Sequence, residues 1–182
     1  HPGERTPTQG EQSVEEVREL VAKGKSETHR LMRNDGPGPD GSLRFTDITR
    51  QAGITNHAYG LGICMLDVDN NGWPDVYVAN DYAEPDYLYV NNGKGGFTNQ
   101  VKERTKHVSN FGMGVDVGDI DNDGMQDICV LDMAFKSHQR SKQNMGAMRP
   151  AKFWAYVDAG LHYQYMFNTL QRNNGNGSFS EI

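Results

Sequence analysis

The chain has 182 residues, enough for one compact domain or for part of a larger one. Its 18 basic and 24 acidic residues give a formal net charge of −6, which disfavours a nucleic-acid-binding protein that depends on bulk positive charge. Hydrophobic residues make up 36% and glycines number 21, a composition that favours a loop-rich β protein over a helical bundle. No apolar run approaches the roughly 18 residues that a transmembrane helix needs.

Residues 1–27 differ in composition from the rest of the chain and form a region of their own. Residues 1–12 are rich in Gly, Pro, Gln, Glu and Thr, which is typical of a flexible arm. A short helix is predicted over residues 13–23, because Ser13 and Glu16 fit a capping box at its start.

Residues 28–182 contain an internal repeat. The acidic stretch Asp67–Asp75 (DVDNNGWPD) recurs 52 residues later as Asp119–Asp127 (DIDNDGMQD), each time between a glycine-spaced apolar stretch and a β-type run. Three Asn-Gly or Asp-Gly segments, which begin at Leu31, Leu88 and Leu170, are strong hairpin signals. One unit therefore holds four strands in about fifty residues, the size of a β-propeller blade. The sequence predicts an all-β fold, a partial β-propeller of about three four-stranded blades.

An insert at about residues 134–169 interrupts the repeat. Pro150 is predicted to open a helix there, which Gly160 ends. The first part of the insert carries basic and aromatic residues and no acidic ones, so we expect it to dock a protein partner, a glycan or anionic lipid headgroups. The alternative is that its apolar residues simply cover the propeller. The residues proposed for docking are Arg140, Lys142, Arg149, Lys152 and Trp154.

The two acidic loops have the spacing of a cation-binding loop. Side-chain oxygens at positions one, three, five and nine converge with the carbonyl of position seven, and the glycine at position six allows a sharp turn. Calcium takes six to eight such oxygens, whereas magnesium demands a tighter octahedron, so we predict two Ca²⁺ sites. The predicted ligands are Asp67, Asp69, Asn71, Trp73 and Asp75 in the first loop and Asp119, Asp121, Asp123, Met125 and Asp127 in the second.

Two alternatives to this interpretation differ in strength. The loops could be Asp/Asn/Gly turns without a metal, but their recurrence in register favours calcium. An EF-hand is excluded, because its twelfth position needs a bidentate Glu and is occupied here by Val78 or Val130. Since the second loop has four carboxylates and the first has three, we predict tighter binding by the second.

At these residues the sequence resembles the FG-GAP/VCBS repeat β-propellers, and more closely the bacterial propellers similar to cartilage acidic protein, which are often followed by an ASPIC-type domain. The resemblance covers about residues 28–182. It implies a secreted or surface-exposed, calcium-stabilised propeller of seven or so blades that serves adhesion or assembly, without a catalytic residue set. The supporting stretches are Phe45–Thr49 with Ala52–Ile54, Asn80–Tyr82 with Asp86–Gly93, and His162–Met166.

Three blades would leave sheet edges open, so we expect these residues to be part of a longer chain or to be completed by other chains. The leading hypothesis is a non-enzymatic, calcium-binding propeller segment in an extracellular, cell-surface or periplasmic complex. The alternative is a propeller-fold hydrolase or lyase acting on glycans, which would show His, Asp or Glu converging on a pocket away from the acidic loops. A calcium sensor ranks last, because no bistable element is evident. Cys64 and Cys129 are expected to be buried thiols rather than a disulfide, although export would permit the bond.

Overall fold

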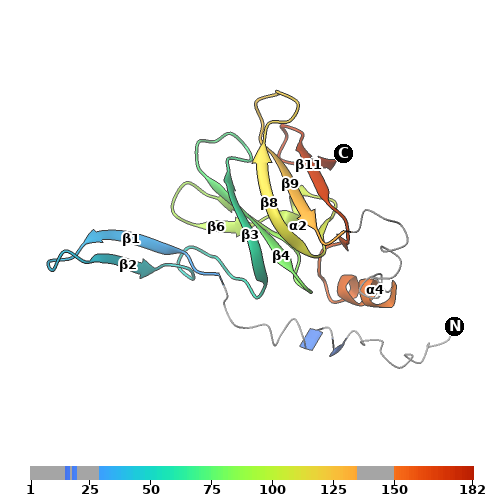
Figure 1. The fold of residues 1–182 in the computed structure, drawn as a ribbon, viewed down its shortest axis with the longest axis horizontal. Coiled ribbons are helices and arrows are strands. Elements are labelled where there is room, and N and C mark those ends of the chain that lie inside the picture. The colour runs from blue at the N-terminus through green and yellow to red at the C-terminus, as the bar shows by residue number, and fades with distance from the viewer. Residues whose placement is uncertain (1–14, 17, 20–28, 135–149) are drawn as a thin grey trace.

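A computed structural model describes residues 15–16, 18–19, 29–134 and 150–182, and two four-stranded antiparallel sheets form its centre (Figure 1). Both sheets keep the order of their strands along the chain. The first sheet contains β3 (Tyr59–Leu66), β4 (Asp75–Asp81), β5 (Tyr87–Asn91) and β6 (Phe97–Asn99). The second contains β8 (Gly112–Gly118), β9 (Asp127–Asp132), β11 (Thr169–Asn173) and β12 (Phe179–Glu181).

The two sheets are structural copies of the sequence repeat. The pairing of β3 with β4 shifts register between Gly60 and Gly62, and the pairing of β8 with β9 shifts at the equivalent place, between Gly112 and Gly114. Such an irregularity bends a strand and increases its twist. The glycine-spaced stretch therefore has the same local structure in both copies.

The remaining elements are shorter and flank the sheets. A hairpin of β1 (Met32–Pro37) and β2 (Leu43–Asp47) projects away from them (Figure 1). β7 (Val108–Ser109) pairs in parallel with β10 (Gln164–Tyr165), and the helices are α2 (Val101–Arg104) and α4 (Pro150–Asp158). The all-β fold is confirmed. The count of three four-stranded blades is not, because the described residues contain two such sheets and the first hairpin copy, which begins at Leu31, forms the two-stranded β1–β2.

The predicted helix of the insert is present. It begins at Pro150, and Gly160 follows its end with a φ of 89°, a left-handed conformation that suits glycine. Of the helix predicted over residues 13–23, the structure describes residues 15, 16, 18 and 19, which are helical and exposed. Within the described ranges, no helix combines the length and the apolar character that crossing a membrane requires. The predicted docking residues Arg140, Lys142 and Arg149 lie outside the described residues.

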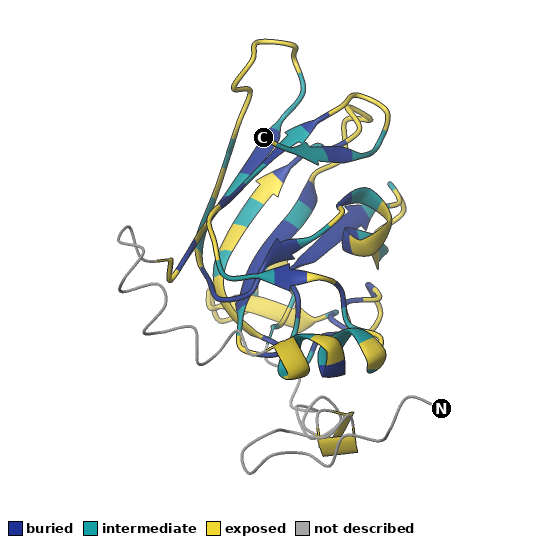
Figure 2. Cartoon of the chain, turned by 90° about the vertical axis from the view of Figure 1, so that its right-hand side faces the viewer, coloured by how far each residue is buried: buried dark blue, intermediate teal, exposed yellow. Residues whose placement is uncertain are grey.

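The main hydrophobic core lies between the two sheets. Leu66, Tyr77 and Leu88 of the first sheet are buried in one cluster with Ile128 and Val130 of the second. A second cluster lies on the opposite face of the first sheet, where Val78, Tyr87 and Tyr89 pack against the segment that precedes β3. Figure 2 shows the buried residues concentrated on these central strands and the exposed ones on the projecting loops.

The sheets approach closely where β3 crosses β8. A Cβ atom on Gly62 would lie 3.0 Å from the backbone nitrogen of Val115 and 3.1 Å from the Cα of Gly114. Nearby, the Cys64 thiol donates a hydrogen bond to the Val115 carbonyl at 3.0 Å. Cys64 and Cys129 are both free thiols in this structure, and both are half-buried rather than buried as expected.

The Gly62→Ala substitution is expected to destabilise the fold by about 1–3 kcal/mol, because the new methyl group would press on backbone atoms of the facing sheet, which cannot move aside. Gly114→Ala is the matched control: Gly114 is the repeat equivalent of Gly62, yet a Cβ there meets no atom within 4 Å among the described residues. Urea unfolding of both variants measures the difference, and equal stabilities would contradict the close packing at Gly62.

Candidate metal centre

The first acidic loop is held in shape by hydrogen bonds from its own backbone. Asp67 accepts the N–H groups of Asn71 at 3.0 Å and of Gly72 at 2.7 Å, one on each carboxylate oxygen. Asn71 in turn accepts the N–H of Trp73 at 2.8 Å. Asn70 and Gly72 have φ angles of 52° and 84°, and Asn and Gly are the residues that adopt this left-handed region most readily.

The second loop repeats this arrangement position by position. Asp119 accepts the N–H groups of Asp123 at 3.0 Å and of Gly124 at 2.9 Å, and Asp123 accepts the N–H of Met125 at 2.8 Å. Asn122 and Gly124 have φ angles of 59° and 86°. Two separate segments with the same spacing therefore fold into the same loop.

The ninth position of each loop is a buried aspartate that ties the loop to the neighbouring hairpin. Asp75 accepts the N–H of Val68 at 2.9 Å and that of Asn91 at 2.7 Å. Asp127 accepts the N–H of Ile120 at 2.9 Å and that of Asn173 at 2.7 Å. Asp75 and Asp127 are 0% and 1% exposed, so each carboxylate is removed from water and depends on these donors.

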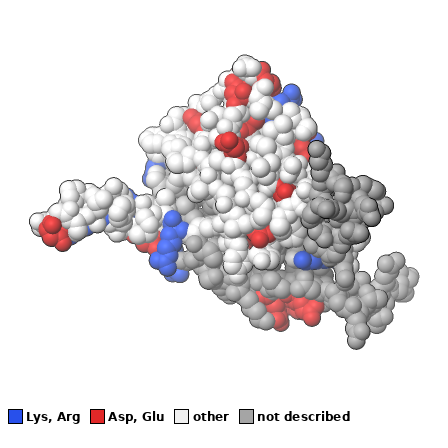
Figure 3. All heavy atoms as spheres, in the orientation of Figure 1, with Lys and Arg blue, Asp and Glu red and all other residues white. Residues whose placement is uncertain are grey.

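Three carboxylates converge in each loop. One oxygen from each of Asp67, Asp69 and Asp75 lies within 4.8 Å of the others, and the same holds for Asp119, Asp121 and Asp127. Burial raises the pKa of Asp75, which its two backbone donors oppose and the charges of Asp69 and Asp67 reinforce. Acidic side chains are visible over the loop between β8 and β9 at the top of Figure 3.

The other predicted ligands are not among the carboxylates that converge. Asp123 is not one of the three carboxylates that converge in the second loop. Its oxygen and that of Asn71 hold the N–H groups of Met125 and Trp73. Ligation by Asn71, by Asp123 and by the carbonyls of Trp73 and Met125 stays a prediction.

An arginine approaches the third position of each loop. Arg104 of α2 lies 3.7 Å from an Asp69 oxygen, and Arg172 of β11 lies 3.9 Å from an Asp121 oxygen. These distances are too long for hydrogen bonds, so each contact is an ion pair alone. Because one arginine faces three or four carboxylates, it compensates the negative charge of its loop only in part. Three aspartates and one arginine give the first loop a formal charge of −2; four aspartates and one arginine give the second −3.

The two loops touch each other at the same end of the sheets. The N–H of Asp67 donates to the Gln126 side chain at 2.8 Å, and the Asn70 amide donates to the Gly124 carbonyl at 3.3 Å. Asn173, whose N–H is held by Asp127, also donates through its side chain to the Val68 carbonyl at 2.8 Å. The two loops are therefore joined by direct hydrogen bonds.

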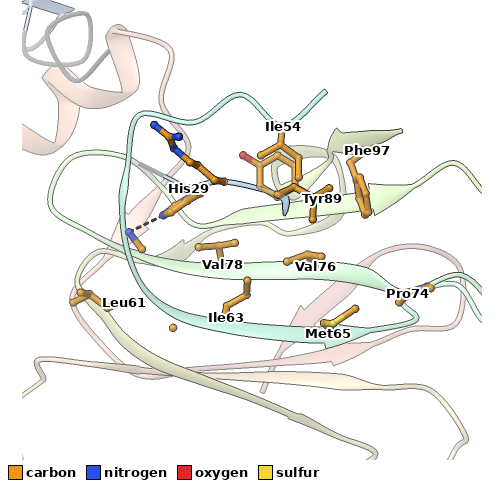
Figure 4. A pocket seen from close by; sticks show the side chains of 14 residues that line it. His29, Ile54, Leu61, Ile63, Met65, Pro74, Val76, Val78, Tyr89 and Phe97 are labelled. Carbon is orange, nitrogen blue, oxygen red and sulfur yellow. Dashed lines mark hydrogen bonds between the residues drawn. The ribbon is translucent and has the colours of Figure 1, made fainter. Parts of the chain in front are cut away.

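A cavity of about 440 Å³ opens on the face of the first sheet that points away from the second sheet (Figure 4). Most of its walls are apolar, among them Ile63, Met65, Val76 and Val78. The enzyme alternative requires His, Asp or Glu side chains that converge on a pocket. Among the residues that line this cavity, His29 is the single one that is a His, Asp or Glu. The cavity therefore does not favour the enzyme alternative.

A second pair of acidic residues, which the sequence analysis did not single out as a site, lies at the opposite end of the sheets. Asp86 and Asp132 are 0% and 9% exposed. Burial raises the pKa of Asp86 to about 7, and the charge of Asp132 adds to this effect. No motif of fixed spacing in the sequence joins these two residues. Asp132 is, however, the repeat equivalent of Asn80, so the second copy has an acidic residue where the first has an amide. This difference between the copies is the sequence signal that could have drawn attention to Asp132.

Among known protein families, the FG-GAP-like repeat matches residues 67–130 of this chain. The match covers about a third of the chain, from the first position of the first acidic loop to the strand after the second loop. FG-GAP repeats are typical of β-propeller-type or adhesion-related modules. The resemblance to this family is therefore confirmed over the two acidic loops and the strands between them.

The His29→Gln substitution is expected to reduce the loss of stability between pH 7 and pH 5. The Nε2 atom of His29 accepts the N–H of Gly60 at 3.0 Å, which only the neutral ring can do, and burial lowers the pKa of His29 below 6.5. Because the folded-state pKa is lowered, the stabilisation is present above pH 6.5 and is lost as the pH falls. A glutamine oxygen can accept the same hydrogen bond at either pH.

Thermal melts of both proteins at pH 7 and pH 5 measure the effect. An equal fall in the midpoints of wild type and variant would contradict it.

Proposed function

We propose that this chain is a non-catalytic, calcium-stabilised β-propeller segment that serves adhesion or assembly in an extracellular, cell-surface or periplasmic complex. The observation that carries the proposal is the pair of matching loops, each of which brings three carboxylates within 4.8 Å of one another. The proposal includes the narrower resemblance to propellers similar to cartilage acidic protein.

Calcium suits these loops because of their charge and their oxygen donors. Carboxylates this close repel one another, and a divalent cation between them attracts each carboxylate more strongly than the carboxylates repel one another. Hard oxygen ligands favour calcium or magnesium, and a set that includes amide or backbone carbonyl oxygens suits calcium. Asp67, Asp69 and Asp75 would hold one ion, and Asp119, Asp121 and Asp127 the other.

The bound ions would act as structural links. Asp75 and Asp127 already tie each loop to the next hairpin, and the loops contact each other through Asn70 and Gln126. In each loop, an ion bound to the aspartates at the first, third and ninth positions would fix that loop against its own sheet. Such a site binds the folded chain and not the unfolded one, so it raises stability.

The proposed location outside the cell rests on the calcium affinity expected of such loops. The first and third carboxylates of both loops are partly or fully exposed, and extracellular modules bind calcium with dissociation constants of about 10⁻⁴–10⁻³ M. Sites of that strength would be filled outside the cell and empty in the cytosol. This argument supports an exported protein.

The partner proposed is a further sheet of the same kind, from the remaining blades or from another chain. Val115 and Val117 of β8 pack on the core between the sheets, whereas their repeat equivalents on β3, Ile63 and Met65, are 69% and 63% exposed. The same face is thus covered in one copy and open in the other. Lys152 and Trp154 on α4 remain proposed contacts of the insert.

Calcium in the millimolar range is expected to raise the melting midpoint of the wild type above that in EGTA. With a dissociation constant of about 10⁻⁴–10⁻³ M, each site adds roughly 0.4–1.4 kcal/mol at about 1 mM calcium, or about 1–6 °C for a domain of this size. Asp69→Asn and Asp121→Asn, a matched pair at the third positions, should each remove part of the rise. Magnesium should give less of it.

Calorimetric titration of the same two variants tests the order of affinities. Asp69→Asn, which leaves the second loop intact, should retain the tighter site. Equal or reversed affinities would contradict the charge argument, and no calcium response in the wild type would contradict the proposed function.

Oxidation of methionine by peroxide tests the partner face without any substitution. Met65 of β3 should be oxidised readily in the isolated chain and protected in the assembled protein, because a further sheet would cover it. Met32 on the projecting β1–β2 hairpin, 45% exposed, is the internal control. Equal oxidation of Met65 in both states would contradict the docking of a sheet on this face.

A further inference from the structure

A buried polar cluster lies at the end of the sheets opposite to the acidic loops, where β4 and β9 end (Figure 1). Residues from several strands surround this cluster. Gly112 faces Asp132 across the β8–β9 ladder, and a Cβ on Gly112 would lie 3.2 Å from the Asn80 carbonyl oxygen. Gln164 of β10 pairs with Val108 of β7 and donates its side-chain amide to the Ala83 carbonyl at 3.0 Å.

The two carboxylate oxygens of Asp132 differ in their hydrogen bonding. Its Oδ2 atom accepts the Ser109 hydroxyl at 2.6 Å and the N–H groups of Asn110 and Phe111, each at 3.0 Å. Its Oδ1 atom is buried and has no hydrogen-bond partner among the described residues. Asp132 is therefore a buried carboxyl group with all its hydrogen bonds on one oxygen and none on the other.

Two amide oxygens of the same cluster are also buried without a donor in the described part of the chain. They are Oδ1 of Asn80 and Oε1 of Gln164, on side chains that belong to residues 0% and 4% exposed. Their orientation is fixed chemically. The Asn80 amide nitrogen donates to the Pro85 carbonyl at 2.7 Å, and that of Gln164 donates to the Ala83 carbonyl. Since a carbonyl can only accept, neither amide can be reversed to satisfy its oxygen.

The cluster is therefore rich in acceptors and poor in donors. The hydroxyl of Tyr77 and the N–H of Asn80 are both used by Asp86, which lies beside them. A buried acceptor without a donor is costly. Three such oxygens, one of them from a carboxyl group, point to a positively charged ligand that binds oxygen atoms.

We propose that Asn80, Asp132 and Gln164 bind a hard, oxygen-seeking cation, calcium or sodium, through these three side-chain oxygens. The ion would neutralise Asp132 and join the end of β4 to β9 and β10. The site is separate from the acidic loops and does not rest on their binding calcium. A water molecule is the competing occupant, but it supplies only two hydrogens for three acceptors and brings no charge.

The repeat supplies the test variant. Asp132→Asn installs the residue that its equivalent position, Asn80, already carries. The new amide oxygen can accept the hydrogen bonds from Ser109, Asn110 and Phe111, while the new amide nitrogen can donate toward the orphaned oxygens. The variant should fold without the ion and lose the response to it. Asn80→Asp is the opposite change: it adds a second charge and should strengthen the response.

The experiment is a set of thermal melts in the Asp69→Asn/Asp121→Asn background, which removes a third-position ligand from each acidic loop. Each protein is melted in choline chloride with EGTA, in sodium chloride with EGTA, and in calcium chloride. We expect the background protein to gain several degrees in at least one cation arm, and the arm identifies the ion. Adding Asp132→Asn should abolish the gain, and adding Asn80→Asp should enlarge it.

Two results would overturn the proposal. One is a background protein that responds to neither cation, which would leave water as the occupant. The other is an Asp132→Asn variant that responds as fully as its parent, which would place the responding site elsewhere. If Asp132→Asn fails to fold, the same judgement is made from Asn80→Asp: an unchanged or smaller response would overturn the proposal. Residual calcium binding by the two altered loops leaves these comparisons unaffected, because it is common to the background protein and to both added substitutions.

Discussion

The buried aspartate at the ninth position of each acidic loop is the interaction on which the arrangement of this chain depends. Asp75 and Asp127 each accept one N–H from the start of their own loop and one from the last residue of the following hairpin strand. Loop, following strand and hairpin are thereby held by a single carboxylate that water does not reach. An ion bound by either loop would therefore add to an arrangement of loop, strand and hairpin that the hydrogen bonds of these two aspartates already hold.

The packing of the sheets follows from that frame and from the glycines that precede each loop. Gly62 lets β3 lie against the backbone of β8, and the core residues Leu66 and Ile128 fill the space beside it. A Cβ on the repeat equivalent Gly114 would meet no atom within 4 Å in the described part of the chain, and the equivalent faces of β3 and β8 differ in exposure. Two copies of one unit are therefore in different surroundings, which is what a row of repeated sheets produces at its two ends.

The sequence was informative for most of the local structure. Gly72 and Gly124 sit at the turn of each acidic loop, Asn92-Gly93 and Asn174-Gly175 join paired strands, and Pro150 opens α4 as predicted. The Asp35-Gly36 signal is wrong about its turn: this pair lies within β1 at a register irregularity, and the turn of that hairpin follows at residues 38–42. The pairing of β7 with β10 and the cluster around Asp132 were not predicted, because they join residues far apart in the chain, among them Ser109 and Gln164. Spacing along a sequence cannot reveal such contacts, and only the replacement of Asn80 by Asp132 between copies marked the place.

The measurement that tests this account most directly is a crystal structure of the chain grown with calcium, with anomalous diffraction used to locate the ions. The account predicts one peak within coordination distance, about 2.3–2.6 Å, of Asp67, Asp69 and Asp75, and another at the same distance from Asp119, Asp121 and Asp127. Loops that keep their shape and hold only water at millimolar calcium would contradict it, because the converging carboxylates would then be turn residues without a metal.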